Sequence, residues 1–255
     1  MTPGPSLETR GLTVRFGGHV AVDGVTCAFR PGELTAIVGP NGAGKTTWFN
    51  LISGQIAASA GSVLLEGQDI TRLSVAARTR RGLGRAFQLT NLFPGLSVLE
   101  NVRLVVQARR GRGFNLWSVA ASHRDLTEAA EAVLDRVRLG PQAHLAVSAL
   151  SHGDQRKLEV ALMIALEPRV FMFDEPTAGM SVDEAPVILD LIAEIKADPA
   201  ATVLLVEHKM DVIRSLADRI VVLHNGALVA DGPPAEVMAS AIVQEAYMGK
   251  EIADA

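Results

Sequence analysis

The most informative part of the chain reads "AIVGPNGAGKTTWFNLISG" and spans residues 36–54. An apolar run meets a glycine-rich segment, and a Lys, two Thr and an amphipathic pattern follow. Residues 39–46 match the spacing G-x-x-x-x-G-K-[ST] between a predicted strand and a predicted helix. Glycines let consecutive N–H groups turn inward, where they form an anion cradle with the helix N-terminus. The sequence therefore predicts a phosphate-binding loop.

The residues of this loop have distinct expected roles. Lys45 places a point charge on the β- and γ-phosphates of a nucleotide, and Thr46 offers a hydroxyl to Mg²⁺. The alternative is a glycine-rich turn that matches by chance, which the flanking strand and helix disfavour. The predicted nucleotide-binding residues of the loop are Gly39, Pro40, Asn41, Gly42, Ala43, Gly44, Lys45, Thr46 and Thr47.

Two further segments carry polar residues at the ends of apolar runs. In "VFMFDEP", residues 170–176, four apolar residues precede Asp174 and Glu175 at the expected carboxyl end of a strand. Asp174 suits the Mg²⁺ shell, and Glu175 is placed to polarise an attacking water; the alternative is a solvated acidic turn. "VLLVEH" brings His208 to the end of another buried strand. His208 is a candidate γ-phosphate sensor that also holds the water, and a structural histidine is the alternative.

The bulk properties of the chain exclude several classes of protein. It has 255 residues, 48% of them hydrophobic, a net charge of -4 and a sequence pI near 5.9, which argues against a dedicated nucleic-acid binder. Its one cysteine, Cys27, cannot form an internal disulfide and is expected to be a small buried hydrophobe. No apolar run approaches the roughly 18 to 20 residues that span a bilayer, and no signal peptide is recognisable. We expect a soluble, cytoplasmic protein that can still dock on a membrane protein.

Strands and helices alternate along much of the chain, which predicts an α/β fold with an open sheet. The first eighty-odd residues read as strands and turns around one helix, and a mainly helical region follows from about residue 89 to residue 145. Two clusters of arginines are expected on solvated loops and helix faces: Arg78, Arg80, Arg81 and Arg85, and Arg109, Arg110 and Arg112. The expected strands are 12–17, 25–30, 34–39, 61–70, 170–176 and 201–208, with a hairpin at 219–232. The expected helices are 46–53, 96–110, 122–139, 152–168, 183–198, 210–218 and a short tail from 234, with a loop at 111–118.

Together these motifs resemble the ATP-binding-cassette (ABC) ATPases. Beside the loop and the D-E strand end stand Gln88 in "RAFQLTNLF", "LSHGDQ" from Leu150, "DEPTAGM" and His208, in the family's order and over nearly the whole chain. The "LSHGD" segment resembles the family signature L-S-G-G-Q. The resemblance implies a P-loop NTPase (RecA-like) core with an N-terminal antiparallel β subdomain and a helical insert. The core with its β subdomain would be 1–87 and 149–233, the helical subdomain 88–148 and the tail 234–255.

The resemblance also implies roles for residues outside the loop. Two cassettes would pair head to tail around two ATP molecules, so that Ser151 and Gly153 face the γ-phosphate held by the partner's loop. Gln88 would contact Mg²⁺–ATP and report it to a transmembrane partner, and Phe16 would stack on adenine, a core role being its alternative. The implied catalytic residues are Glu175, His208, Lys45 and Gln88, and the implied Mg²⁺ ligands are Thr46, Gln88 and Asp174.

Three residues depart from the family pattern. His152 replaces the first signature Gly, Asp154 replaces the usual Gln, and Ser181 stands where an Asp is common. These departures put the finer cross-dimer contacts in doubt, whereas the catalytic set is intact and hydrolysis is expected. A nucleotide-binding module without turnover is disfavoured for the same reason.

Within the family the chain is most similar to the cassettes of branched-chain amino-acid importers. "PTAGMS", "VEHKMDVI" and the end "IVQEAYMG" favour that branch, and "LSHG" and "VLHNGALVADG" favour its urea and short-amide members. The expected partners are permease subunits, a second cassette (another copy or a paralogue) and indirectly a periplasmic binding protein, at the cytoplasmic face of the inner membrane. The alternatives are an aromatic-acid importer, a lipopolysaccharide or lipid exporter, and a soluble cassette acting on DNA or the ribosome.

Overall fold

The computed structural model describes residues 4–86, 92–111, 124–181 and 184–240. The chain forms two compact units. Unit 1 consists of residues 1–83, 169–175 and 193–255, and unit 2 of residues 84–168 and 176–192. None of the helices in the described ranges is long and apolar enough to cross a bilayer.

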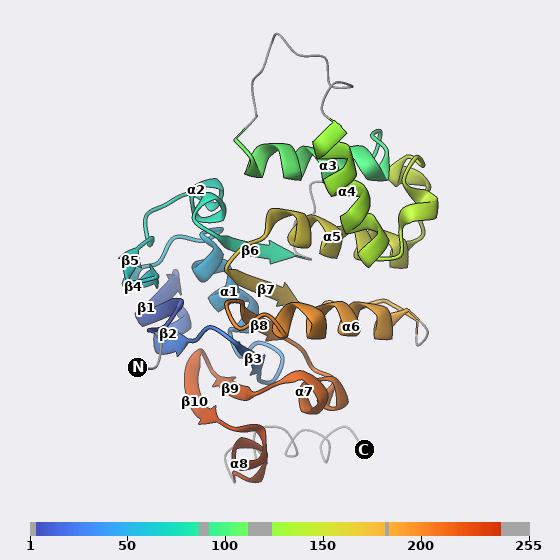
Figure 1. Ribbon diagram of the computed structural model, residues 1–255. Coiled ribbons are helices and arrows are strands. Elements are labelled where there is room, and N and C mark those ends of the chain that lie inside the picture. Colours follow the sequence, from blue (N-terminus) through green and yellow to red (C-terminus); the bar gives the residue numbers. More distant parts are fainter. Residues whose placement is uncertain (1–3, 87–91, 112–123, 182–183, 241–255) are drawn as a thin grey trace. The chain divides into compact units, whose positions relative to one another are not determined.

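Unit 1 contains an antiparallel sheet with the strand order β2-β1-β4-β5 (Figure 1). Its long hairpin is made of β1 (Leu7–Phe16) and β2 (His19–Phe29), and β1 pairs on its other side with β4 (Ala60–Leu65). β4 turns back into the short β5 (Gln68–Asp69). The predicted N-terminal antiparallel sheet is confirmed, and its first two strands begin earlier than their apolar patterns indicated.

The second sheet supplies the edge on which the site is built. β3 (Glu33–Val38) lies between β8 (Thr202–Val206) and β9 (Arg219–His224) and runs parallel to both, and β7 (Val170–Asp174) runs parallel to β8. β10 (Ala227–Gly232) pairs antiparallel with β9. Every residue of β7 and β8 is buried, which is why both segments read as continuous apolar runs. The α/β fold expected from the sequence is confirmed.

Helix α1 (Lys45–Ser53) shares one hydrophobic core with both sheets of unit 1. Trp48 and Phe49 are fully buried, and the Trp48 ring lies 5.8 Å from that of Phe29 on β2. Fully burying such a side chain stabilises the fold by about 1.5–3 kcal/mol. The helix that follows the phosphate loop is therefore held by packing over most of its length.

Helix α2 (Val75–Arg80) corrects the expectation of a single helix among the first eighty-odd residues. Its start and stop signals are present in the sequence. The Ser74 hydroxyl accepts a hydrogen bond from the Ala77 amide at 3.4 Å, and Gly82 follows with φ of 99°. A helix of six residues is too short to show a hydrophobic period. Two further helices among the described residues lie wholly in unit 1, α7 (Met210–Leu216) and α8 (Pro234–Ala239).

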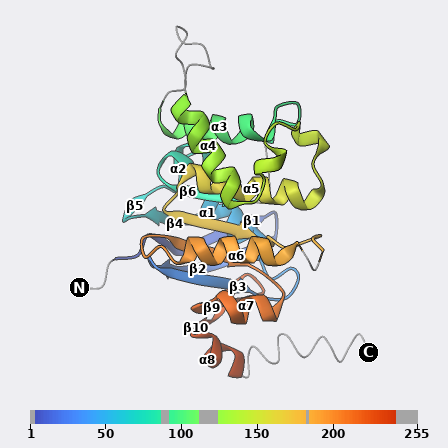
Figure 2. The same ribbon diagram turned by 45° about the vertical axis from the view of Figure 1, so that its right-hand side comes forward.

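Unit 2 is mainly helical, with α3 (Val98–Arg109), α4 (Arg124–Arg136) and α5 (His152–Leu166) in mutual contact (Figure 2). Ser97 caps α3 near the start of the helix expected at 96–110, and its hydroxyl accepts from the Glu100 amide at 3.1 Å. Two elements have residues in both units, β6 (Leu83–Ala86) and α6 (Ala185–Lys196). In the strand order of the second sheet, β6 follows β7. The predicted loop at 111–118, apart from its first residue, lies outside the described residues.

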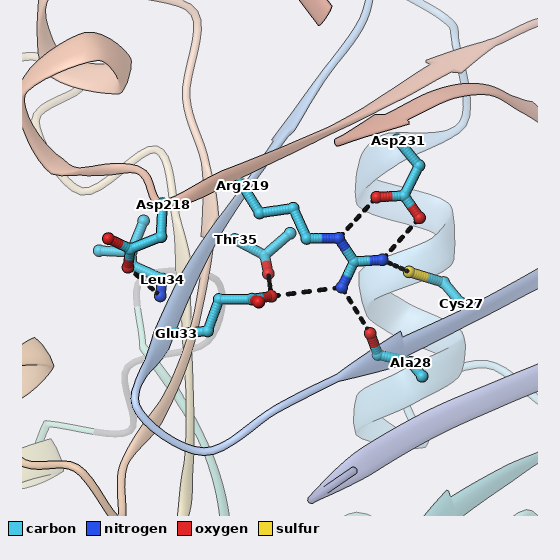
Figure 3. Close-up of polar contacts among 8 residues, drawn as sticks. All are labelled: Cys27, Ala28, Glu33, Leu34, Thr35, Asp218, Arg219 and Asp231. Atoms are coloured by element: carbon cyan, nitrogen blue, oxygen red, sulfur yellow. Dashed lines mark hydrogen bonds and ion pairs between the residues drawn. The ribbon is translucent and has the colours of Figure 1, made fainter. Parts of the chain in front are cut away.

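Arg219, at the start of β9, links both sheets of unit 1 (Figure 3). Its guanidinium binds both oxygens of Asp231 at 2.5 and 2.6 Å, and Nη1 donates to the Ala28 carbonyl at 2.6 Å and to Glu33 at 3.2 Å. The hydrogen bonds to Asp231 raise the pKa of Arg219. The Cys27 Sγ lies 3.7 Å from Nη2 of Arg219. Burial raises the pKa of the Cys27 thiol to about 12. Cys27 is thus buried as predicted, and it contacts a cation as well as the core.

We expect Arg219→Met to lower the free energy of unfolding by about 2 kcal/mol, because it leaves two carboxylates and a carbonyl without their shared donor. Urea denaturation followed by circular dichroism measures this change. Arg10→Met is the control, since Arg10 pairs with Glu8 on the exposed surface. Equal midpoints for the two variants would contradict the proposed role of Arg219.

Candidate nucleotide site

The site lies where neighbouring parallel strands of unit 1 end. β7, β8 and β3 are adjacent, and their carboxyl ends share one edge of the sheet. β3 leads into the glycine-rich loop, β7 ends at Asp174, and β8 is followed by Glu207 and His208. Segments more than 160 positions apart in the sequence therefore meet at one edge, where α/β sheets bind their ligands.

The glycines of the loop meet two different constraints. Gly42 has φ of 81° with open space around it, so its conformation alone favours glycine. A Cβ on Gly44, where φ is 97°, would lie 2.5 Å from the Ala21 carbonyl oxygen of β2. A Cβ on Gly39 would overlap the Leu223 carbonyl oxygen of β9. The loop is wedged between the backbones of both sheets, and these contacts fix the path of its backbone.

The turn between β9 and β10 also contacts the glycine-rich loop. Asn225 and Gly226 have φ of 47° and 80°, and the Gly226 amide donates to the Ala43 carbonyl at 3.0 Å. A Cβ on Gly226 would lie 2.9 Å from the Ala21 oxygen. The sequence predicted this hairpin without giving its turn a role. The Asn-Gly dipeptide was the available signal, since it is typical of tight hairpins whose backbone enters the left-handed region.

Lys45 is buried, with 6% of its surface exposed, although its side chain carries a charged ammonium group. Its Nζ donates to the carbonyls of Gly39 and Pro40 at 2.6 and 3.0 Å. Burial lowers the pKa of Lys45, and the carboxylates of Glu175 and Asp174 oppose that shift. The loop carbonyls therefore hold the ammonium against the loop. The negative charges of Glu175 and Asp174 act on it there.

The residues expected to hold Mg²⁺ offer the oxygen ligands that this ion prefers. Thr46 is exposed at the start of α1, and Asp174 is buried at the end of β7. Among the residues that the structure places, no three His, Cys, Asp or Glu side chains cluster as a metal cage. One hydroxyl and one carboxylate fit Mg²⁺ because it takes few protein ligands and completes its shell with phosphate and water. Gln88 lies outside the described residues.

Glu175 and His208 form the polar pair beside this cradle. Glu175 Oε1 lies 2.8 Å from His208 Nε2, and the two side chains are 43% and 37% exposed. Glu175 also has φ of 50°, a strained conformation for a residue other than glycine. The Glu175 amide donates to the Val206 carbonyl at 3.0 Å, which fixes this turn against β8. The carboxylate is thus oriented by its neighbours and open to solvent, as a group that positions water must be.

Phe16 ends β1 with 50% of its surface exposed. This exposure excludes the core alternative for Phe16. An exposed aromatic ring at a strand end is free to stack on a base, which keeps the adenine role open.

The signature segment lies in unit 2, at the start of α5. The Ser151 hydroxyl caps this helix by accepting from the Asp154 amide at 3.1 Å. Gly153 is buried, and a Cβ there would overlap the carboxylate of Glu184. The same carboxylate accepts from the amide and the hydroxyl of Ser181 at 3.2 and 3.0 Å. Glu184 therefore joins the segment after the D-E strand to the signature helix, a role that its position in the sequence did not indicate.

Asp154 and His152 are the two other residues that depart from the family pattern, and the structure describes both. Asp154 forms an ion pair with Lys157 at 2.8 Å, one turn along α5. His152 is exposed, and its ring faces the space beside Gly179, where φ is 73°. Asp154 is thus neutralised within its own helix.

Comparisons with known proteins assign the chain to a family. The family model described as ABC transporter matches residues 22–178. This chain belongs to the ABC transporter family. A second model, branched-chain amino acid ATP-binding cassette transporter, matches residues 227–253. As a member of this family the chain is an ATP-binding subunit with ATPase activity.

Two curated relatives of this ABC protein cover almost its full length. It is 37% identical to the high-affinity branched-chain amino acid transport ATP-binding protein BraF of Pseudomonas aeruginosa over 96% of this chain and 98% of that protein. It is 36% identical to LivG of Escherichia coli strain K12, which carries the same description, with the same coverage. The ADP conformation of MJ1267, an ATP-binding cassette of an ABC transporter, matches with a TM-score of 0.81 and 28% identity over 97% of this chain and 100% of that one.

We predict that Gly39→Ala destabilises this ABC ATPase more than Gly42→Ala. The Gly42 variant carries only the backbone strain of about 1–3 kcal/mol, because nothing lies within 4 Å of its added methyl group. The Gly39 variant adds an overlap with the Leu223 carbonyl, which must displace β9 or the loop. Urea denaturation ranks the two variants. The reverse order would contradict the packing described for the loop.

Proposed function

We propose that the chain is the ATP-hydrolysing subunit of an importer for branched-chain amino acids. The observation that carries this proposal is the match of residues 227–253 to a branched-chain amino acid cassette model, together with full-length relatives of that description. A soluble cassette acting on DNA or the ribosome is disfavoured, because the net charge is -4.

The proposed chemistry uses the residues at the edge of the parallel sheet. The amides of the loop and Lys45 hold the phosphates, and Glu175 accepts a proton from the attacking water while His208 holds both in place. The contact between Glu175 and His208 supports this division of roles. Mg²⁺, when bound by Thr46, Asp174 and Gln88, supplies positive charge at the phosphate oxygens.

The proposed assembly completes this site with a second cassette, either another copy or a paralogue. Ser151 and Gly153 would cover the γ-phosphate of the opposite ATP, as the helix cap at Ser151 allows. Residues 88–148 would act as a helical subdomain, residues 1–87 and 149–233 as the core and 234–255 as a tail. Gln88 would carry the nucleotide state to permease subunits at the cytoplasmic face of the inner membrane, with a periplasmic binding protein delivering substrate.

Two sequence segments favour other substrates within the same branch of the family. "LSHG" and "VLHNGALVADG" resemble cassettes for urea or short amides more than those for amino acids. An aromatic-acid importer and a lipopolysaccharide or lipid exporter are further alternatives. The cargo contacts the membrane and binding subunits, so their identity decides between these proposals.

The importer proposal is tested by purifying the membrane complex through a tag on this chain and measuring ATPase activity in vesicles. We expect a binding protein loaded with leucine, isoleucine or valine to stimulate hydrolysis, because loading commits the complex to transport. Stimulation by urea or a short amide alone would move the assignment to that branch. An active complex that requires lipid and no binding protein would support the exporter.

The role of Glu175 is tested by Glu175→Gln, which keeps the shape of the side chain and removes the base. We expect turnover to fall by at least about 100-fold, and ATP to hold two cassettes together in size-exclusion chromatography with light scattering. Glu236→Gln, an exposed change of the same kind in α8, is the control. Unchanged turnover in Glu175→Gln would refute the assignment of the base.

A further inference from the structure

Arg78 contradicts the expectation that its arginine cluster is solvated. It belongs to α2, and 2% of its surface is exposed. Burial lowers the pKa of Arg78, and Asp69 opposes that shift. A guanidinium remains protonated in proteins, so a full positive charge is buried here. Such a charge is costly unless it is compensated.

The compensation comes from backbone carbonyls, and two of them belong to the helix that follows the phosphate loop. Nη1 donates to the carbonyls of Leu51 at 2.8 Å and Ile52 at 2.6 Å, in the last turn of α1. Nε donates to the Leu73 carbonyl at 3.1 Å and Nη2 to the Thr71 carbonyl at 2.6 Å. Arg78 therefore fastens the carboxyl end of α1 to the segment that precedes α2.

Gly54 makes room for this contact. It ends α1 in a left-handed conformation with φ of 83°. A Cβ there would lie 2.7 Å from Nε and 2.9 Å from Cζ of Arg78. The guanidinium thus lies directly against the end of α1, where carbonyl groups carry partial negative charge.

We propose that Arg78 is a positioning residue for the nucleotide site, holding α1 so that the amides at its other end face the phosphates. This rests on the proposed nucleotide role of the loop. α1 has nine residues and is about 14 Å long, so the two ends are only two and a half turns apart. A helix this short is marginal without tertiary support. Arg78 at one end and phosphate at the other both favour the same placement of α1.

This arrangement links Arg78 thermodynamically to nucleotide affinity. Without the guanidinium, two carbonyls of α1 lose their buried donor and the helix populates other placements. Apparent affinity then falls in proportion to the fraction of molecules with α1 in the binding-competent placement. A merely structural residue changes the unfolding equilibrium and leaves the affinity of folded molecules unchanged.

The test is the dissociation constant of ADP with Mg²⁺, measured by calorimetry on the full chain where circular dichroism shows it folded. We expect Arg78→Met to raise this constant about 3- to 30-fold. Arg78→Lys should give an intermediate value, because an ammonium keeps the charge and cannot reproduce the four-carbonyl pattern. Arg80→Met is the matched control, since Arg80 is exposed on the same helix, and it should leave the constant unchanged.

Gly54→Ala provides an independent variant that displaces the guanidinium without removing it. It should raise the ADP constant as well, and combining it with Arg78→Met should add less than the sum of the two effects. If Arg78→Met does not fold, Arg78→Lys and Gly54→Ala carry the test. Wild-type ADP affinity in the folded variants would overturn the role of Arg78, whereas absence of ADP binding to the unmodified chain would instead overturn the proposed function.

Discussion

The proposed nucleotide site depends on how closely the backbone of the glycine-rich loop approaches the backbones of neighbouring strands. Carbonyl oxygens of Leu223 and Ala21 occupy the places where side chains on Gly39 and Gly44 would begin. Because only glycine fits, the loop approaches β9 and β2 closely enough for Gly226 to donate a hydrogen bond to it. The conformation of one short loop is thus set by strands from both ends of the chain.

Helix α1 connects this loop to the hydrophobic core and to Arg78. Its amino end continues the loop and carries Lys45, whose ammonium is held by loop carbonyls. Its middle is packed by Trp48 and Phe49 between two sheets, and its carboxyl end meets Arg78. In the proposed site, phosphate would lie at the amino end of the helix dipole, opposite the arginine at its carboxyl end. The carbonyls at that end of α1 help to compensate the buried charge of Arg78.

Different contacts orient the residues at the edge of the parallel sheet and at the signature helix. At the edge, Glu175 is held in a strained backbone conformation and paired with His208, so its carboxylate has a defined direction. At the signature, the Glu184 carboxylate lies against Gly153 and binds Ser181, so packing alone already requires glycine at position 153. In the proposed assembly of two cassettes, the sheet edge of one and the signature helix of the other would each supply one half of the site.

Local spacing in the sequence was enough to predict the loop at residues 39–46, the D-E strand end and the α/β fold. Periodicity and glycine placement depend on neighbours a few residues away, and these are visible in one dimension. The burial of Arg78, the contact of Glu175 with His208 and the cover that Glu184 forms over Gly153 were decided by tertiary structure. Each depends on groups brought together from separate segments, and a charged side chain reads as solvated until those partners are known.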